Sequence, residues 1–169
     1  MARIAESLIV SPVKSLVKIF VCAAVLAPFA APALRAQREK LPPEDLAFVE
    51  KTWPEAKKTA SGIRSLVLRE GQGEVAKAGD KAFVLYVGRL LNGKVFDQAE
   101  DRAAPFTFRI GRDAVIQGWD QILQTMKQGE KRLVIIPPEL AYGTRGQPPK
   151  IPRNSTLVFE MELIEFKRE

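Results

Sequence analysis

The stretch that decides the fold is residues 81–97, KAFVLYVGRLLNGKVFD. Its first eleven residues alternate with a period of two, which is typical of a strand with one buried face. The small and apolar residues on that face are Ala82, Val84, Tyr86, Gly88 and Leu90. Asn92-Gly93 follows, the strongest short hairpin signal that a sequence offers, and it leads straight into Val95-Phe96-Asp97. The stretch therefore predicts two antiparallel strands joined by a tight turn.

Further strands are predicted on both sides of this hairpin. IRSLVLR at 63–69 precedes it, and PFTFRI at 105–110 follows it with alternating apolar residues. RLVII at 132–136 is stopped by Pro137-Pro138, and a loop with five prolines and two glycines fills 137–154. In the last segment, 155–166, one face carries Leu157, Phe159, Met161 and Leu163. Consecutive hairpins of this kind favour antiparallel pairing.

One amphipathic helix interrupts the strands. Its apolar residues recur at spacings of three, four and three positions and so share one face of a helix: Ile116, Trp119, Leu123 and Met126. Gly129 ends the segment. A run of strands with a single helix indicates an α+β fold. We expect an antiparallel sheet curled over one short helix.

Residues 37–60 form a polar segment before the first long strand. Pro43 followed by Glu44-Asp45 can open a short helix, since proline suits the first helical position and acids suit the first turn. Leu46, Val49 and Trp53 would then share one stripe, and the helix would end before Pro54. The pattern leaves a docked helical appendage and a mobile spacer equally open.

Residues 1–36 have the organisation of a secretory signal peptide. The basic residues Arg3, Lys14 and Lys18 precede a sixteen-residue uncharged run, IFVCAAVLAPFAAPAL at 19–34, and small residues allow cleavage after Ala33 or Ala36. A retained membrane anchor is the alternative, but spanning needs about 20 apolar residues. Cleavage would place the protein in the periplasm or outside the cell, without stable membrane insertion.

The lone cysteine, Cys22, lies inside this apolar run. Lipidated cysteines usually follow a small residue, and the residues before Cys22, Ile19-Phe20-Val21, are all large. Cys22 is therefore interpreted as a small hydrophobic residue of the leader. The whole chain carries a net charge of +6, and removal of 1–36 leaves 22 basic and 19 acidic side chains, or +3. That balance argues against a nucleic-acid binder, which needs a basic patch.

The composition excludes several catalytic chemistries. The chain has no histidine, so neither a Ser-His-Asp nor a Cys-His nucleophile can be built. One cysteine permits no intramolecular disulfide and no cysteine-rich zinc site. No group of carboxylates has the spacing of metal ligands, and no metal or cofactor is expected.

At this level of detail the sequence strongly resembles the FKBP-type peptidyl-prolyl cis-trans isomerases. The resemblance covers about residues 62–166 and would make 61–169 the isomerase domain. It rests on separated motifs in the family's order: YVGRL at 86–90, NGKVFD at 92–97, VIQGW at 115–119, MKQGEK at 126–131, PELAYG at 138–143, IP at 151–152 and STLVF at 155–159.

The resemblance implies a five- to six-stranded antiparallel sheet around one short helix, and an apolar pocket for proline. The residues that would act on the substrate amide are Tyr86, Phe96, Asp97, Tyr142 and Phe159. Those that would bind the substrate are Trp119 at the floor, Val115 and Ile116 in the wall, Phe106 and Ile151 at the rim, and Arg102 paired with a tyrosine and with Asp97.

The implied function is acceleration of X-Pro isomerisation in folding polypeptides, without a covalent intermediate or cofactor. Macrolide-type FKBP inhibitors are the implied ligands. A non-catalytic peptide-binding or chaperone module on the same fold is the alternative. Ala114, Gln147 and Lys150 depart from the usual family residues. The loop around Lys150 carries cations and no acid. Solubilising surface charge is the simpler interpretation of these cations, and a cationic rim that prefers prolines with acidic neighbours is the functional hypothesis.

Overall fold

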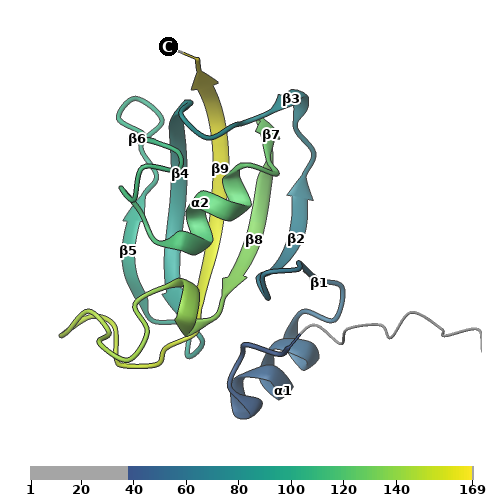
Figure 1. Ribbon diagram of the computed structural model, residues 1–169, viewed down its shortest axis with the longest axis vertical. Helices are drawn as coiled ribbons and strands as arrows, with labels where there is room; N and C mark the ends of the chain where they lie inside the picture. The colour runs from purple at the N-terminus through teal and green to yellow at the C-terminus, as the bar shows by residue number, and fades with distance from the viewer. Residues whose placement is uncertain (1–37, 169) are drawn as a thin grey trace, which may run out of the picture. The chain divides into compact units, whose positions relative to one another are not determined.

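The computed structural model describes residues 38–168, and within that range most strands belong to one antiparallel sheet (Figure 1). The sheet has seven strands in the order β1-β2-β8-β9-β4-β5, with β6 also paired to β4. Their bounds are β1 Lys57–Lys58, β2 Arg64–Arg69, β4 Lys81–Leu90, β5 Val95–Ala99, β6 Phe106–Arg109, β8 Lys131–Ile136 and β9 Leu157–Lys167. The smaller elements are β3 Gln72–Val75 paired with β7 Lys127–Gln128, the helices α1 Pro43–Thr52 and α2 Gln117–Leu123, and the 3₁₀ turn η1 Pro138–Leu140.

Strand β4 is the centre of the sheet, because it pairs with β9 along one edge and with both β5 and β6 along the other. Its predicted inner face is confirmed: Ala82, Val84 and Tyr86 belong to the main core. The turn into β5 is closed by the Leu90 amide, which donates to the Lys94 carbonyl at 3.0 Å. Gly93 takes a φ of 84° there, a conformation that glycine adopts without steric cost.

Helix α2 lies across the inner face of β4, β9 and β8 (Figure 1) and completes the main core. Trp119, Ile122 and Leu123 are its buried side chains. The backbone approaches the sheet so closely that a Cβ on Gly118 would lie 2.5 Å from Ile136 Cγ2. The helix is shorter than the predicted stripe, because Thr125 and Met126 form the tighter i to i+3 bonds that end it.

A second apolar cluster covers the opposite face of the sheet. In β8, Val134 and Ile136 belong to the main core, whereas Leu133 and Ile135 pack with Val49 of α1. The uninterrupted apolar run of β8 therefore reflects burial on both faces. The segment 38–53 packs as a docked helix, with Leu46 and Trp53 on the stripe that the sequence predicts.

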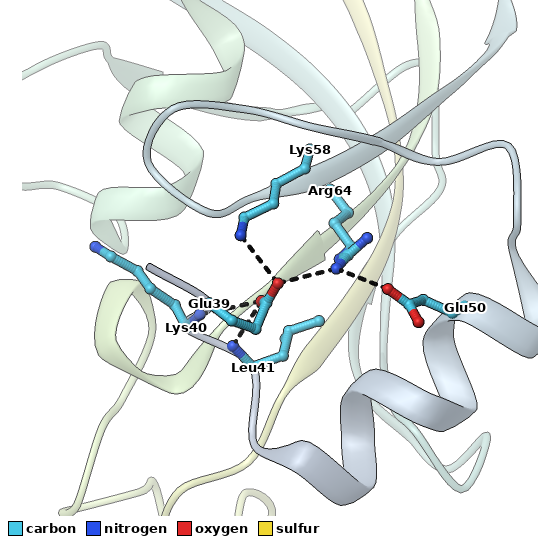
Figure 2. A network of polar contacts seen from close by, with 6 residues as sticks. All are labelled: Glu39, Lys40, Leu41, Glu50, Lys58 and Arg64. Atoms are coloured by element: carbon cyan, nitrogen blue, oxygen red, sulfur yellow. Dashed lines mark hydrogen bonds and ion pairs between the residues drawn. The ribbon is translucent and has the colours of Figure 1, made fainter. Parts of the chain in front are cut away.

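Polar contacts hold this N-terminal segment in place (Figure 2). One Glu39 oxygen accepts hydrogen bonds from Lys58 Nζ at 2.9 Å and from the Arg64 guanidinium at 3.0 Å. The other accepts from the backbone amides of Lys40 and Leu41. Burial by itself would raise the pKa of Glu39, but these hydrogen bonds and the Arg64 charge outweigh it and lower the pKa from 4.5 to about 2.

The α+β class and the antiparallel sheet are confirmed. The strand count exceeds the expected five to six within residues 38–168, because two-residue β1 and short β6 extend the sheet edges. Strands β3 and β7 are too short to leave a periodic pattern. No helix of residues 38–168 is long and apolar enough to cross a membrane. The predicted leader, 1–36, lies outside the described residues.

Because the native pKa of Glu39 is depressed, its contribution to stability is present above pH 4.5 and is lost as the pH falls toward 2. We expect Glu39→Gln to lower the free energy of unfolding by about 1–2 kcal/mol at neutral pH, and less at pH 3. Urea denaturation at both pH values measures the difference. The exposed Glu55→Gln is the matched control. A difference in the free energy of unfolding between wild type and Glu39→Gln that is as large at pH 3 as at neutral pH would contradict the role of the Glu39 charge.

Candidate active site

A pocket of about 130 Å³ opens on the α2 side of the sheet. Strands β4, β5 and β9, helix α2, and the loops before α2 and after η1 all contribute side chains to it. The lining residues are Tyr86, Phe96, Asp97, Phe106, Ala114, Val115, Ile116, Trp119, Tyr142 and Phe159. Nine of the eleven residues proposed from the sequence thus meet at one place, although they come from segments up to 73 positions apart.

Aromatic rings build the apolar interior of the pocket around Trp119. The Tyr86 ring lies 4.8 Å from the Trp119 ring and the Phe159 ring 5.3 Å from it, measured between centroids and both edge-to-face. The Phe96 ring meets the Phe159 ring at 5.6 Å and 90°. These are the arrangements that aromatic quadrupoles favour. Trp119 Nε1 is buried without a hydrogen-bond partner in residues 38–168, which is uncommon for a tryptophan with a purely structural role.

Gly88 makes room for two of these rings. A Cβ built on Gly88 would lie 2.7 Å from Phe96 Cζ and 2.8 Å from Phe159 Cε1, closer than real side chains approach. The sequence placed Gly88 on the buried face of β4 without assigning it a role in the site. A glycine inside a strand is itself the available signal, because it marks close approach of another group.

Tyr86 and Asp97 form the polar edge of the pocket. The Tyr86 hydroxyl donates to Asp97 Oδ2 at 2.8 Å, and the Gln98 backbone amide donates to Oδ1 at 3.1 Å. The two residues face each other because β4 and β5 pair antiparallel across the turn. Burial, followed by the hydrogen bond to Asp97 and its charge, raises the pKa of Tyr86 well above 10. Tyr86 therefore keeps its proton and orients the carboxylate.

Tyr142 enters the pocket from the loop after η1. The Gly143 amide donates to the Pro138 carbonyl at 2.9 Å, and the Gly146 amide donates to the Tyr142 carbonyl at 3.0 Å. These bonds fix the backbone on both sides of the ring. Burial and the negative charge of Asp97 raise the pKa of Tyr142. Its hydroxyl thus holds its proton more tightly than an ordinary tyrosine and can serve the pocket as a hydrogen-bond donor.

The opposite wall is formed by the loop that enters α2, which supplies Ala114, Val115 and Ile116. Asp120 of α2 holds the start of this loop, since its Oδ1 accepts the Gly111 amide at 2.8 Å. Asp120 is a positioning contact that the sequence pattern did not reveal. An acid in a first helical turn is common for electrostatic reasons alone.

Two residues expected at the site lie elsewhere. Arg102 was expected beside a tyrosine and Asp97, but its guanidinium donates to Glu162 at 2.6 Å and lines a different cavity. Arg69 reaches the same Glu162 oxygen, and these two arginines outweigh the effect of burial and lower the pKa of Glu162. Ile151 was expected at the rim, but it is only 1% exposed and packs in the main core.

The site can bind and orient an apolar ring without forming a covalent bond. Its interior is hydrocarbon, and its polar groups are one carboxylate and two phenols that keep their protons. Within residues 38–168 no cluster of histidine, cysteine or acidic side chains could hold a metal ion. The arrangement of rings and neutral phenols is suited to binding and desolvating an apolar ring.

The chain contains two tyrosines, Tyr86 and Tyr142, and both have raised pKa values. At pH 10, where about half of ordinary tyrosine side chains are ionised, we expect the native protein to show clearly less phenolate absorbance than the unfolded protein. The same protein unfolded in guanidinium should show about half of its full phenolate absorbance at this pH. Circular dichroism verifies that the fold persists at pH 10. Equal native and unfolded absorbance would contradict the buried, neutral state of both phenols.

The family model of the FKBP-type peptidyl-prolyl cis-trans isomerases matches residues 72–164. The chain is 50% identical over 113 residues to peptidyl-prolyl cis-trans isomerase FKBP4 of Rattus norvegicus, a match that covers 66% of this chain and 25% of that protein. The present chain thus spans about a quarter of the length of that relative.

A shorter relative is matched along almost its whole length. FK506-binding protein 1 of Dictyostelium discoideum is 43% identical over 106 residues, which is 63% of this chain and 99% of that protein. Among solved structures, a peptidyl-prolyl cis-trans isomerase of Pseudomonas syringae superposes with a TM-score of 0.66 at 39% identity, covering 74% of this chain and 92% of the other. This chain belongs to the family of FKBP-type peptidyl-prolyl cis-trans isomerases.

Proposed function

We propose that the protein accelerates cis–trans isomerisation of X-Pro bonds in polypeptides. The single observation that carries this function is the aromatic pocket around Trp119, sized for a small apolar ring and edged by Asp97 and Tyr142. Membership of the isomerase family supports it. Polypeptides that are still folding are the proposed substrates, because their X-Pro bonds are accessible and isomerise slowly.

The mechanism needs no proton transfer to the substrate. Twisting an amide breaks its C–N resonance and costs about 18–20 kcal/mol. The planar amide is dipolar and the twisted amide has lost that charge separation, so a water-excluded aromatic pocket disfavours the planar state relative to the twisted one. In this mechanism the Tyr142 hydroxyl would donate to a substrate carbonyl, and its position in the pocket lining supports that role. The rings hold the proline while the bond turns.

Inhibitor binding would use the same pocket. The Dictyostelium relative is named for binding FK506, and we extend binding of macrolide-type FKBP inhibitors to this chain. A non-catalytic peptide-binding module remains the alternative function on this fold. The presence of Asp97, Tyr142 and the full ring cluster favours catalysis, because a binding role alone does not require the polar edge.

Catalysis is tested with residues 37–169 in a protease-coupled assay of a proline peptide. We expect the slow phase to accelerate, and Asp97→Asn to lower kcat/KM at least about tenfold, equivalent to 1.4 kcal/mol of differential stabilisation. Asp97 is exposed, so the variant should keep its unfolding midpoint. Asp101→Asn is the matched control, because Asp101 is an exposed aspartate in the segment after β5 that does not line the pocket.

Peptide binding, measured by tryptophan fluorescence, separates the two candidate functions. Binding with an unchanged slow phase would establish the non-catalytic module. Neither binding nor acceleration would overturn both candidates.

We also propose that residues 1–36 direct export to the periplasm or the cell exterior and are then removed. The basic start, the sixteen-residue apolar run and the small residues near its end support this proposal. Expression in a Gram-negative host followed by mass spectrometry of the purified protein should give a chain that begins at Leu34 or Gln37. A mass that includes Met1–Arg35 in a membrane fraction would instead indicate a retained anchor.

A further inference from the structure

A second cavity of about 300 Å³ adjoins the aromatic pocket. Phe96 and Asp97 line both cavities, so the two share one wall. The other lining residues of the second cavity belong to the loop after η1: Gln147, Pro148, Pro149 and Lys150. A residue next to a proline in the first pocket is therefore within reach of the second cavity.

The backbone that carries Lys150 is held rigidly. Gln147 and Ile151 form a two-way bridge, in which the Gln147 amide donates to the Ile151 carbonyl at 2.8 Å and the Ile151 amide donates back at 3.0 Å. The Lys150 amide donates to the Gln147 carbonyl at 3.1 Å. Ile151, which the sequence placed at the rim, is the buried anchor of this turn. Lys150 thus stands at the tip of an ordered turn and needs little reorganisation to bind.

The Lys150 side chain is exposed and forms no ion pair within residues 38–168. The surrounding loop offers it no acidic partner, because no Asp or Glu occurs between Glu139 and Glu160, whereas Arg145 and Arg153 add positive charge. Asp97, the carboxylate of the shared wall, already accepts hydrogen bonds on both oxygens. The cavity therefore combines the rings of Phe96, Pro148 and Pro149 with the Asp97 carboxylate, which is held by Tyr86, and with a Lys150 ammonium group that forms no ion pair within residues 38–168.

We propose that this second cavity is a subsite for an acidic side chain next to the proline. The rings of Pro148, Pro149 and Phe96 would pack against the methylene groups of a glutamate, and Lys150 Nζ would pair with its carboxylate. A lysine at the same substrate position would meet like charge instead. This inference rests on the proposed function, since it assigns a substrate class to the same site.

The expected preference is modest because the ion pair is solvent-exposed. Pairs of this kind change equilibria about two- to fivefold. Salt should weaken the preference, since screening acts strongly on exposed charges. Dependence on ionic strength therefore separates charge pairing from an effect of side-chain size.

The test compares peptides that carry Glu, Gln or Lys beside the proline, with the variable residue placed before it in one series and after it in another. We expect kcat/KM for the Glu peptide to exceed that for the Lys peptide about two- to fivefold at low salt in one series, and the ratio to approach one at high salt. Lys150→Gln should remove the preference and Lys150→Glu should invert it. Lys94→Gln, an exposed cation that lines neither cavity, should leave the ratio unchanged.

Equal rates for Glu and Lys peptides at low salt in both series would overturn the proposal, as would a preference that persists in Lys150→Gln. Dissociation constants for the same peptides, from tryptophan fluorescence, test the subsite even where no catalysis occurs. Failure of the proposed function would abolish acceleration for every peptide. Failure of the subsite alone would leave acceleration intact and independent of substrate charge.

Discussion

The edge-to-face packing of rings on Trp119 is the interaction on which the site depends. Tyr86 from β4 and Phe159 from β9 both meet Trp119, so the same contacts join the helix to the sheet and form the pocket interior. The absence of a side chain at Gly88 is what lets Phe96 and Phe159 meet over β4. The binding surface is thus continuous with the core. Its rings are held by close packing against other core side chains.

Each face of the sheet is covered by a helix, and the two helices have different structural roles. Helix α2 fills the inner face and supplies the pocket floor, whereas α1 packs on the outer face against β8 and β9. The Glu39 network and the hydrogen bond from Thr156 to Asp45 fix the α1 segment near the start of β9. Support on the outer face restrains the strand that carries Phe159 into the pocket.

The chemistry of the site agrees with the unusual composition of the chain. A sequence without histidine has few groups that exchange protons near neutral pH. The proposed reaction does not require any, because rotation about the amide bond breaks C–N resonance without making or breaking a covalent bond and without a net proton transfer. Burial and the proximity of Asp97 raise the pKa values of Tyr86 and Tyr142, so both phenols hold their protons more tightly than ordinary tyrosines do.

The sequence by itself determined the order of the longer strands and of helix α2, the inner faces of β4 and β9, and most of the residues that meet in the pocket. It could do so because alternation, the Asn92-Gly93 turn and the family motifs are local patterns of residues. Only the tertiary structure decided that Arg102 pairs with Glu162, that Ile151 is buried, and that Lys150 borders a second cavity. Those outcomes depend on which distant strand or loop lies alongside each residue. The partners of a long side chain such as Arg102, or of a residue in a proline-rich loop, are set by packing and charge in the folded chain. A local pattern of residues does not contain that information.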